Sequence, residues 1–164
     1  MQMRPHGFKN RRAGFTLIEM LVVLAIMAML AGAARPMLEM SVKRAKEHEL
    51  RMSLRTLRGA IDAYKKAAEA GHVKVAADES GYPPNLQVLV SGVVDAKTAD
   101  GKKQYFLRRL PRDPFANATL EPAETWGLRA ADSPPDEPRA GKDVFDVYSR
   151  SEGRALDGTR YRDW

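Results

Sequence analysis

The chain has 164 residues, a formal net charge of +6 and no cysteine, which excludes disulfides and thiolate metal sites. The first part is strongly basic, because four positive charges and no acidic residue precede Gly14: Arg4, Lys9, Arg11 and Arg12. Taking those four charges from +6 leaves a net charge of +2 on the remainder. This charge is too small for general electrostatic binding to DNA, so no nucleic-acid partner is expected. Beyond its apolar start, the chain is long enough for one modest domain.

A basic segment followed by a long apolar run opens the sequence. Residues 1–14 are polar and have no apolar helical face, which indicates a disposable leader. Residues 15–34 are apolar apart from Glu19, and a helix of about 20 residues spans roughly 30 Å, a bilayer core. We therefore predict a transmembrane helix over residues 15–35, with its N-terminus kept cytoplasmic by the basic leader. A secretory signal peptide is disfavoured, because Gly14 precedes the long apolar run instead of following it.

Glu19 is the exceptional residue of this span. A charged side chain inside a bilayer costs roughly 2.5 to 3.5 kcal/mol on insertion scales. A carboxylate at this position is therefore expected to have a partner. That partner is expected to come from a neighbouring chain.

The apolar pattern continues after the span as an amphipathic helix over residues 36–70. Pro36 removes one backbone hydrogen bond, which favours a kink and not an end. Apolar residues spaced by three and four form a stripe expected to pack on a small domain: Leu50, Leu54, Leu57, Ile61, Tyr64 and Ala68. Charged residues off the stripe are expected to face solvent or neighbouring subunits: Arg51, Arg55, Arg58, Asp62, Lys65 and Lys66. Gly71 is the expected C-cap.

Residues 71–164 have the pattern of a small α+β domain. Residues 86–90 form a short apolar piece after a proline turn and predict one or two helical turns, whereas residues 95–103 are loop-like. β-branched and aromatic residues predict strands over 125–130 and 144–149, separated by a proline-rich loop. The sequence thus predicts a long helix packed on a small antiparallel sheet.

Catalytic patterns are lacking in the sequence. The three histidines, His6, His48 and His72, have no zinc or triad spacing. No glycine-rich phosphate loop is followed by Lys and Ser or Thr. We therefore expect a protein that is not an enzyme.

The stretch Gly14-Phe-Thr-Leu-Ile-Glu-Met-Leu-Val-Val23 resembles the N-terminal motif of type IV prepilins and of the pseudopilins of type II secretion. The resemblance implies that a prepilin peptidase cleaves between Gly14 and Phe15 and methylates the new amino group of Phe15. It also implies that Glu19 is retained for filament assembly. The three residues then act together. Cleavage after Gly14 releases the amine of Phe15, and Glu19 of a neighbouring copy pairs with that amine.

The later half is similar to the major pseudopilin of type II secretion systems. Leu110-Pro-Arg-Asp-Pro-Phe115 resembles that subfamily's Leu-Pro-Lys-Asp-Pro-Trp segment, and Phe145-Asp-Val-Tyr-Ser149 and a final Asp-Trp follow in the same order. The resemblance is weakest over residues 74–101 and 120–143, which suggests a paralogue. It implies a pilin-like α+β fold, whose domains are the leader, the membrane helix, the amphipathic helix and the globular remainder.

The function implied is that of a structural subunit of a periplasmic pseudopilus that drives protein export by a type II secretion system. The implied partners are further copies in a filament, prepilin peptidase, minor pseudopilins, the inner-membrane secretion platform and membrane lipid. The implied location is the inner membrane, crossed once, with the globular domain in the periplasm. One alternative is a type IV pilus subunit in adhesion or DNA uptake, and another is a monomeric membrane-tethered binding module.

The resemblance also raises the question of calcium, which major pseudopilins bind in the loop between their last strands. Here the loop over residues 149–163 is shorter and offers three carboxylates, Glu152, Asp157 and Asp163, among four arginines. Ca²⁺ takes six to eight oxygen ligands, and the arginines either oppose the ion or replace it. Ser149 and Asp157 are the candidate ligands.

Overall fold

The structure is a computed structural model that describes residues 14–164, the side chains of residues 33–36 excepted. The leader lies outside the described residues apart from Gly14, as do its basic side chains and His6. The chain divides into two units, the first ending at Ser41 and the second covering Val42–Trp164.

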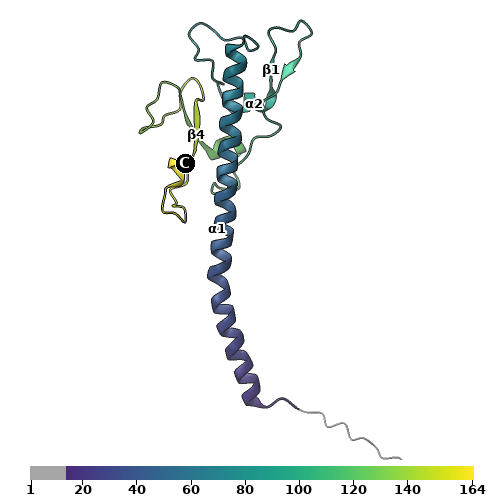
Figure 1. The fold of residues 1–164 in the computed structure, drawn as a ribbon, viewed down its shortest axis with the longest axis vertical. Coiled ribbons are helices and arrows are strands. Elements are labelled where there is room, and N and C mark those ends of the chain that lie inside the picture. The colour runs from purple at the N-terminus through teal and green to yellow at the C-terminus, as the bar shows by residue number, and fades with distance from the viewer. Residues whose placement is uncertain (1–13) are drawn as a thin grey trace, which may run out of the picture. The chain divides into compact units, whose positions relative to one another are not determined.

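Helix α1 is formed by Leu17–Glu69, which confirms the predicted long helix to within two residues at either end (Figure 1). The backbone remains helical through Pro36, so this proline does not end the helix, as predicted. The kink expected there stays a prediction, as do the boundaries of the four predicted domains.

A Schellman motif ends α1 at the predicted glycine. Gly71 has a φ of 78°, in the left-handed region that favours glycine. Its N–H donates to the oxygen of Ala68 at 2.9 Å, and the N–H of His72 donates to the oxygen of Ala67 at 2.9 Å. These bonds satisfy two carbonyl groups that the helix itself leaves unpaired.

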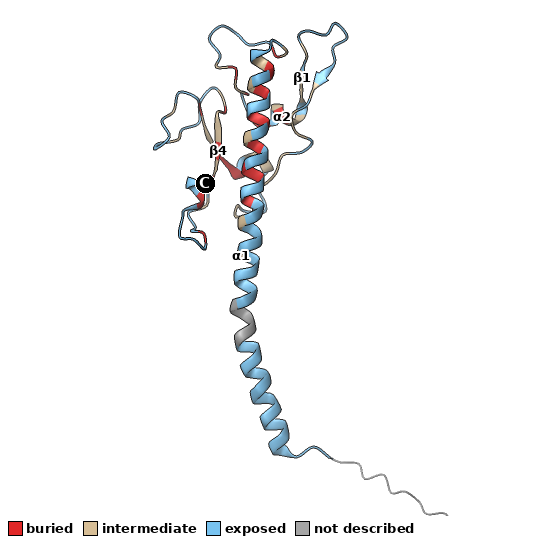
Figure 2. Ribbon diagram, viewed as in Figure 1, coloured by how far each residue is buried: buried red, intermediate tan, exposed pale blue. Residues whose placement is uncertain are grey.

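In the first unit, the described side chains of α1 are exposed on every face of the helix (Figure 2). The large apolar ones include Leu17, Ile18, Leu21, Leu24 and Met29. This part of α1 contains a stretch that is long and apolar enough to cross a membrane by length and composition. A helix that is apolar all round cannot remain in water alone, so another apolar environment has to cover it.

In the second unit, the predicted stripe of α1 forms one side of the core (Figure 2). Five of its six residues are buried, namely Leu50, Leu54, Leu57, Ile61 and Tyr64, while Ala68 is half-buried. The stripe packs with buried residues from the rest of this unit: Leu86, Leu89, Trp126, Val144, Val147 and Tyr161. The 3.6-residue helical period therefore predicted the packed face correctly.

The short elements of the second unit follow α1 along the chain. Helix α2, Gln87–Ser91, and strands β3, Trp126–Arg129, and β4, Asp146–Ser149, occur where the sequence predicts them. β3 and β4 are antiparallel, with Trp126 opposite Ser149 and Arg129 opposite Asp146. Two 3-10 helices are also present: Pro122–Thr125 and Tyr161–Asp163.

A second antiparallel pair was not predicted. β1, Val93–Val94, pairs with β2, Lys103–Gln104, so the prediction that Lys103 belongs to a loop is wrong. These strands have two residues each, too few for a period-2 pattern to be recognised. Together with α1 and the β3–β4 pair, they give the predicted α+β, pilin-like arrangement.

Candidate functional site

The predicted processing segment lies at the start of α1. Gly14 and Phe15 precede the helix, and the side chain of Phe15 is 71% exposed. Thr16 acts as the N-cap, because its hydroxyl accepts the N–H of Glu19 at 3.3 Å and its carbonyl accepts that of Met20 at 3.2 Å. The Gly14–Phe15 peptide bond is therefore left outside the helix.

Glu19 is exposed in the first turn of α1, among exposed apolar side chains. Its carboxylate forms no ion pair within the described residues. A carboxylate near a helix N-terminus interacts favourably with the helix dipole, but this term is small beside the cost of burial in lipid. The geometry thus leaves Glu19 available for a partner outside the chain.

A second cluster of polar contacts holds residues 150–164 on α1, and we call these residues the 150–164 segment. One carboxylate oxygen of Glu47 accepts the N–H of Leu156 at 2.9 Å and the hydroxyl of Tyr161 at 3.0 Å. One turn along, Arg51 pairs with Asp157 at 3.3 Å and places its guanidinium 4.1 Å from the ring centre of Trp164.

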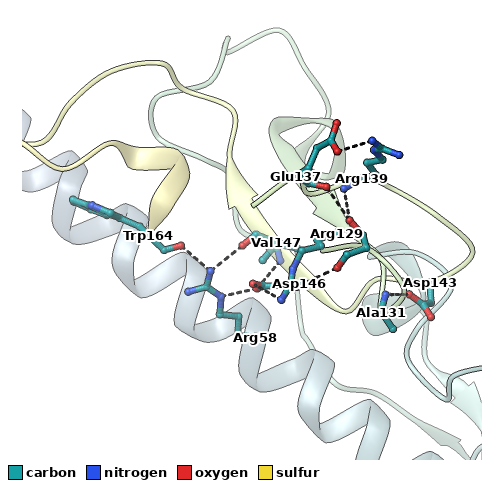
Figure 3. A network of polar contacts seen from close by, with 10 residues as sticks. Arg58, Arg129, Ala131, Glu137, Arg139, Asp143, Asp146, Val147 and Trp164 are labelled. Atoms are coloured by element: carbon teal, nitrogen blue, oxygen red, sulfur yellow. Dashed lines mark hydrogen bonds and ion pairs between the residues drawn. The ribbon is translucent and has the colours of Figure 1, made fainter. Parts of the chain in front are cut away.

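Arg58 completes these contacts (Figure 3). Its Nε donates to Asp146 at 2.8 Å, and its Nη2 donates to the main-chain oxygens of Val147 at 3.1 Å and Trp164 at 2.7 Å. Arg51 is exposed, as expected, and Arg58 is half-buried, but both also bind groups within the chain that the sequence did not predict. These contacts were not predicted because helix periodicity identifies the apolar stripe but not the partners of the long side chains beside it.

Asp113 is a buried carboxylate whose role the sequence did not reveal. It is 2% exposed, and its oxygens accept the N–H of Phe115 at 2.8 Å and the hydroxyl of Ser149 at 2.5 Å. The N–H of Asp113 donates to the hydroxyl of Thr125. These bonds tie the Leu110–Phe115 segment to β4. The resemblance of this segment to the Leu-Pro-Lys-Asp-Pro-Trp motif was the one signal that drew attention to Asp113.

Both candidate calcium ligands have hydrogen-bond partners within the chain. Ser149 is fully buried and directs its hydroxyl hydrogen at Asp113. Asp157 is exposed and accepts bonds from Arg51 and from both the N–H and the hydroxyl of Thr159, at 2.9 and 2.6 Å. The structure gives the two residues separate partners, and no His, Asp or Glu group of three or more in the described part of the chain could hold a metal ion. Ca²⁺ needs six to eight oxygens.

Two groups of this cluster have shifted pKa values. The bonds from Thr159, followed by the charge of Arg51, lower the pKa of Asp157. Burial, reinforced by the neighbouring Glu47 carboxylate, raises the pKa of Tyr161 to about 12. Tyr161 also stacks on Phe115, with 4.2 Å between ring centres. Its neutral hydroxyl is therefore the form compatible with this packing.

The raised pKa predicts a specific alkaline loss of stability. The phenol of an unfolded chain titrates near pH 10, so the contribution of Tyr161 is complete below about pH 10. It is lost as the pH rises towards 12, the pKa in the folded chain. Tyr161→Phe should lower the free energy of unfolding by about 1 kcal/mol at pH 8, because the bond to Glu47 is lost. Above pH 10, the free energy of unfolding of this variant should fall less steeply than that of the unchanged protein. Urea midpoints of both proteins between pH 8 and 11.5 test this, and parallel curves would contradict it.

Comparisons with known proteins identify the family. A family model described as "Prokaryotic N-terminal methylation motif" matches residues 9–34, which include Gly14, Phe15 and Glu19. The type II secretion system core protein G of Aeromonas hydrophila is 30% identical over 113 residues, covering 66% of this chain and 71% of its own length. The proteins of the same name from Klebsiella pneumoniae and Escherichia coli K12 are 32% and 29% identical, covering 72% and 84% of their own lengths and 66% and 77% of this chain.

No solved structure matches the chain. The family assignment therefore rests on the methylation motif and on the relatives, and the α+β arrangement of the chain agrees with both. The exposed apolar start of α1 fits the methylation motif that covers it. The chain belongs to the family of the type II secretion system core protein G.

Proposed function

We propose that this chain is a structural subunit of a periplasmic pseudopilus that drives protein export by a type II secretion system. The observation that carries the proposal is the start of α1, which is exposed and apolar on every face and is covered by the methylation motif. Such a helix requires lipid before assembly and other helices after it. Stacked copies of the same helix satisfy this requirement in a filament core.

Maturation precedes assembly in this proposal. Prepilin peptidase cleaves between Gly14 and Phe15 and methylates the amine that cleavage creates. The non-helical backbone before Leu17 and the exposed Phe15 side chain support this role, because a peptidase needs access to a backbone that is not held in a helix. Removing the leader also removes its four positive charges from the cytoplasmic side.

Glu19 sets the register of assembly. An α-amine is mostly protonated at neutral pH, so Phe15 of one copy offers a positive charge to Glu19 of the next. Each charge is costly alone in lipid, and their meeting neutralises both. The partners are then further copies of this chain, prepilin peptidase, the minor pseudopilins, the inner-membrane platform and membrane lipid.

The proposed location is the inner membrane, crossed once, with residues 1–14 cytoplasmic before cleavage and the globular domain in the periplasm. The basic leader supports this orientation. The role is structural and not catalytic. A type IV pilus subunit is the alternative, and a protein that supports surface pili but no export would favour it.

The test is the fate of the Gly14–Phe15 bond. A side chain at Gly14 would meet no atom of this chain within 4 Å, so Gly14→Val should leave the fold intact. When the chain is produced with a prepilin peptidase, intact mass should show the unchanged protein to lack residues 1–14 and to carry a methyl group. Gly14→Val should remain uncleaved, because its β-branched side chain blocks close approach of the enzyme to the backbone.

Gly32→Val is the matched control, since Gly32 also has no atom within 4 Å of an added side chain. It should be processed at the normal rate. Cleavage of Gly14→Val as fast as of the control, or no cleavage of the unchanged protein, would refute the proposed maturation.

A further inference from the structure

Fifteen residues after β4 carry little apolar surface, yet they are held against the core at Tyr161 and Ala155. In the 150–164 segment, Ala155 and Tyr161 are the buried residues, and the exposed remainder includes four arginines: Arg150, Arg154, Arg160 and Arg162. A segment with so few buried side chains needs additional contacts to offset its conformational entropy. A bound metal ion or protein side chains can supply them.

Three guanidinium groups bind oxygens of this segment. Arg51 neutralises Asp157 and covers the ring of Trp164, while Arg58 binds the main-chain oxygen of Trp164. Within the segment, Arg154 donates to the main-chain oxygen of Gly158 at 3.1 Å. We call Arg51, Arg58 and Arg154 the arginine clasp. Each of them satisfies an oxygen that would otherwise be free to ligate a metal.

Several other polar atoms of the segment are paired by hydrogen bonds within it. The main-chain oxygen of Gly153 accepts the N–H of Tyr161 at 3.2 Å, and the N–H of Ala155 donates to the oxygen of Thr159 at 2.8 Å. The indole N–H of Trp164 donates to the hydroxyl of Thr159 at 2.7 Å. These bonds close the turn around Gly158, whose φ is 87°. The turn is thus held by hydrogen bonds within the chain.

We infer that the 150–164 segment is closed on α1 by the arginine clasp and needs no bound calcium ion. The geometry of Ser149 agrees, because its hydroxyl is committed to the buried Asp113. A divalent cation here would have to displace Arg51 from Asp157 and would face the four arginines of the segment. The inference goes beyond the proposed function and does not depend on it.

The first arm of the test uses the full chain in detergent micelles and compares calcium with its chelator. Thermal unfolding followed by tryptophan fluorescence should give the same Tm, within about 1 °C, in 1 mM CaCl₂ and in 1 mM EGTA. A Tm that falls by several degrees in EGTA and recovers when calcium is restored would overturn the inference. This arm needs no variant and cannot be confounded by misfolding.

The second arm removes the guanidinium of Arg51. Arg51→Ala should lower the Tm by about 3 °C and speed tryptic cleavage after Arg154 and Arg160 about fivefold, because the segment opens more often. Arg51→Lys should give an intermediate result, since it retains the charge but not the planar stacking on Trp164.

Arg55→Ala is the matched control. Arg55 is exposed on the next turn of α1 and forms no ion pair within the described residues. The Arg55→Ala variant should have the same Tm and the same rate of tryptic cleavage as the unchanged protein. Equal behaviour of Arg51→Ala and Arg55→Ala would overturn the inference as surely as a calcium-dependent Tm.

Discussion

Glu19→Ala is expected to abolish filament assembly while membrane insertion and removal of the leader proceed normally. A carboxylate in lipid costs roughly 2.5 to 3.5 kcal/mol, and assembly recovers this cost when Glu19 meets a neighbour's amine. Without the carboxylate that driving force disappears, which lowers the affinity for each added subunit by about 60- to 300-fold. The measurement is the yield of sheared filaments from cells that contain the secretion machinery, with intact mass to verify processing.

Glu39→Ala supplies the control, because Glu39 is an exposed carboxylate on the same helix and lies beyond the predicted membrane span. Its loss changes the charge equally but removes no partner of the Phe15 amine. Filament yield should be close to normal for this variant. Normal filaments from Glu19→Ala would remove the basis for the amine–carboxylate pairing.

Trp126→Ala is expected to destabilise the second unit severely. Trp126 is fully buried at the start of β3, and its indole N–H donates to the oxygen of Pro111 at 2.9 Å. Truncating a buried tryptophan costs about 3 to 5 kcal/mol, a large part of the roughly 5 to 15 kcal/mol that stabilise a typical domain. The Tm followed by circular dichroism should fall by about 10 °C or more.

Trp126→Phe separates packing from hydrogen bonding. It retains an aromatic ring in the core but leaves the oxygen of Pro111 without its donor, so its cost should be about 1 to 3 kcal/mol. The Tm should therefore lie between those of the unchanged protein and Trp126→Ala. Equal melting of the two variants would show that the hydrogen bond, and not the packing, accounts for the loss.

The features that the sequence predicted correctly are local. The helical stripe from Leu50 to Tyr64, the C-cap at Gly71 and the strands around Trp126 and Val147 each depend on neighbours a few residues away. The periodicity of apolar residues is therefore sufficient to identify them. The processing motif is equally local, and the comparison with known proteins confirmed the family that it indicated.

The features that the sequence missed join residues distant along the chain. Arg51 and Asp157 are 106 residues apart, and Arg58 and Asp146 are 88 apart. A pattern read along the chain describes these arginines as a solvated helix face, since nothing near them reveals a partner. β1 and β2 were missed for a related reason, because two residues show no alternation.

The sequence by itself determined the long helix, the Gly14–Phe15–Glu19 motif and the family, because helix periodicity and a contiguous motif are properties of neighbouring residues. The tertiary structure alone decided how the 150–164 segment is held and what surrounds Ser149 and Asp157. Ser149 and Asp157 were candidate calcium ligands because their side chains carry oxygens. Which groups bind those oxygens depends on where the folded chain places its arginines and Asp113. That choice depends on contacts that exist only after α1 and the later strands have packed together.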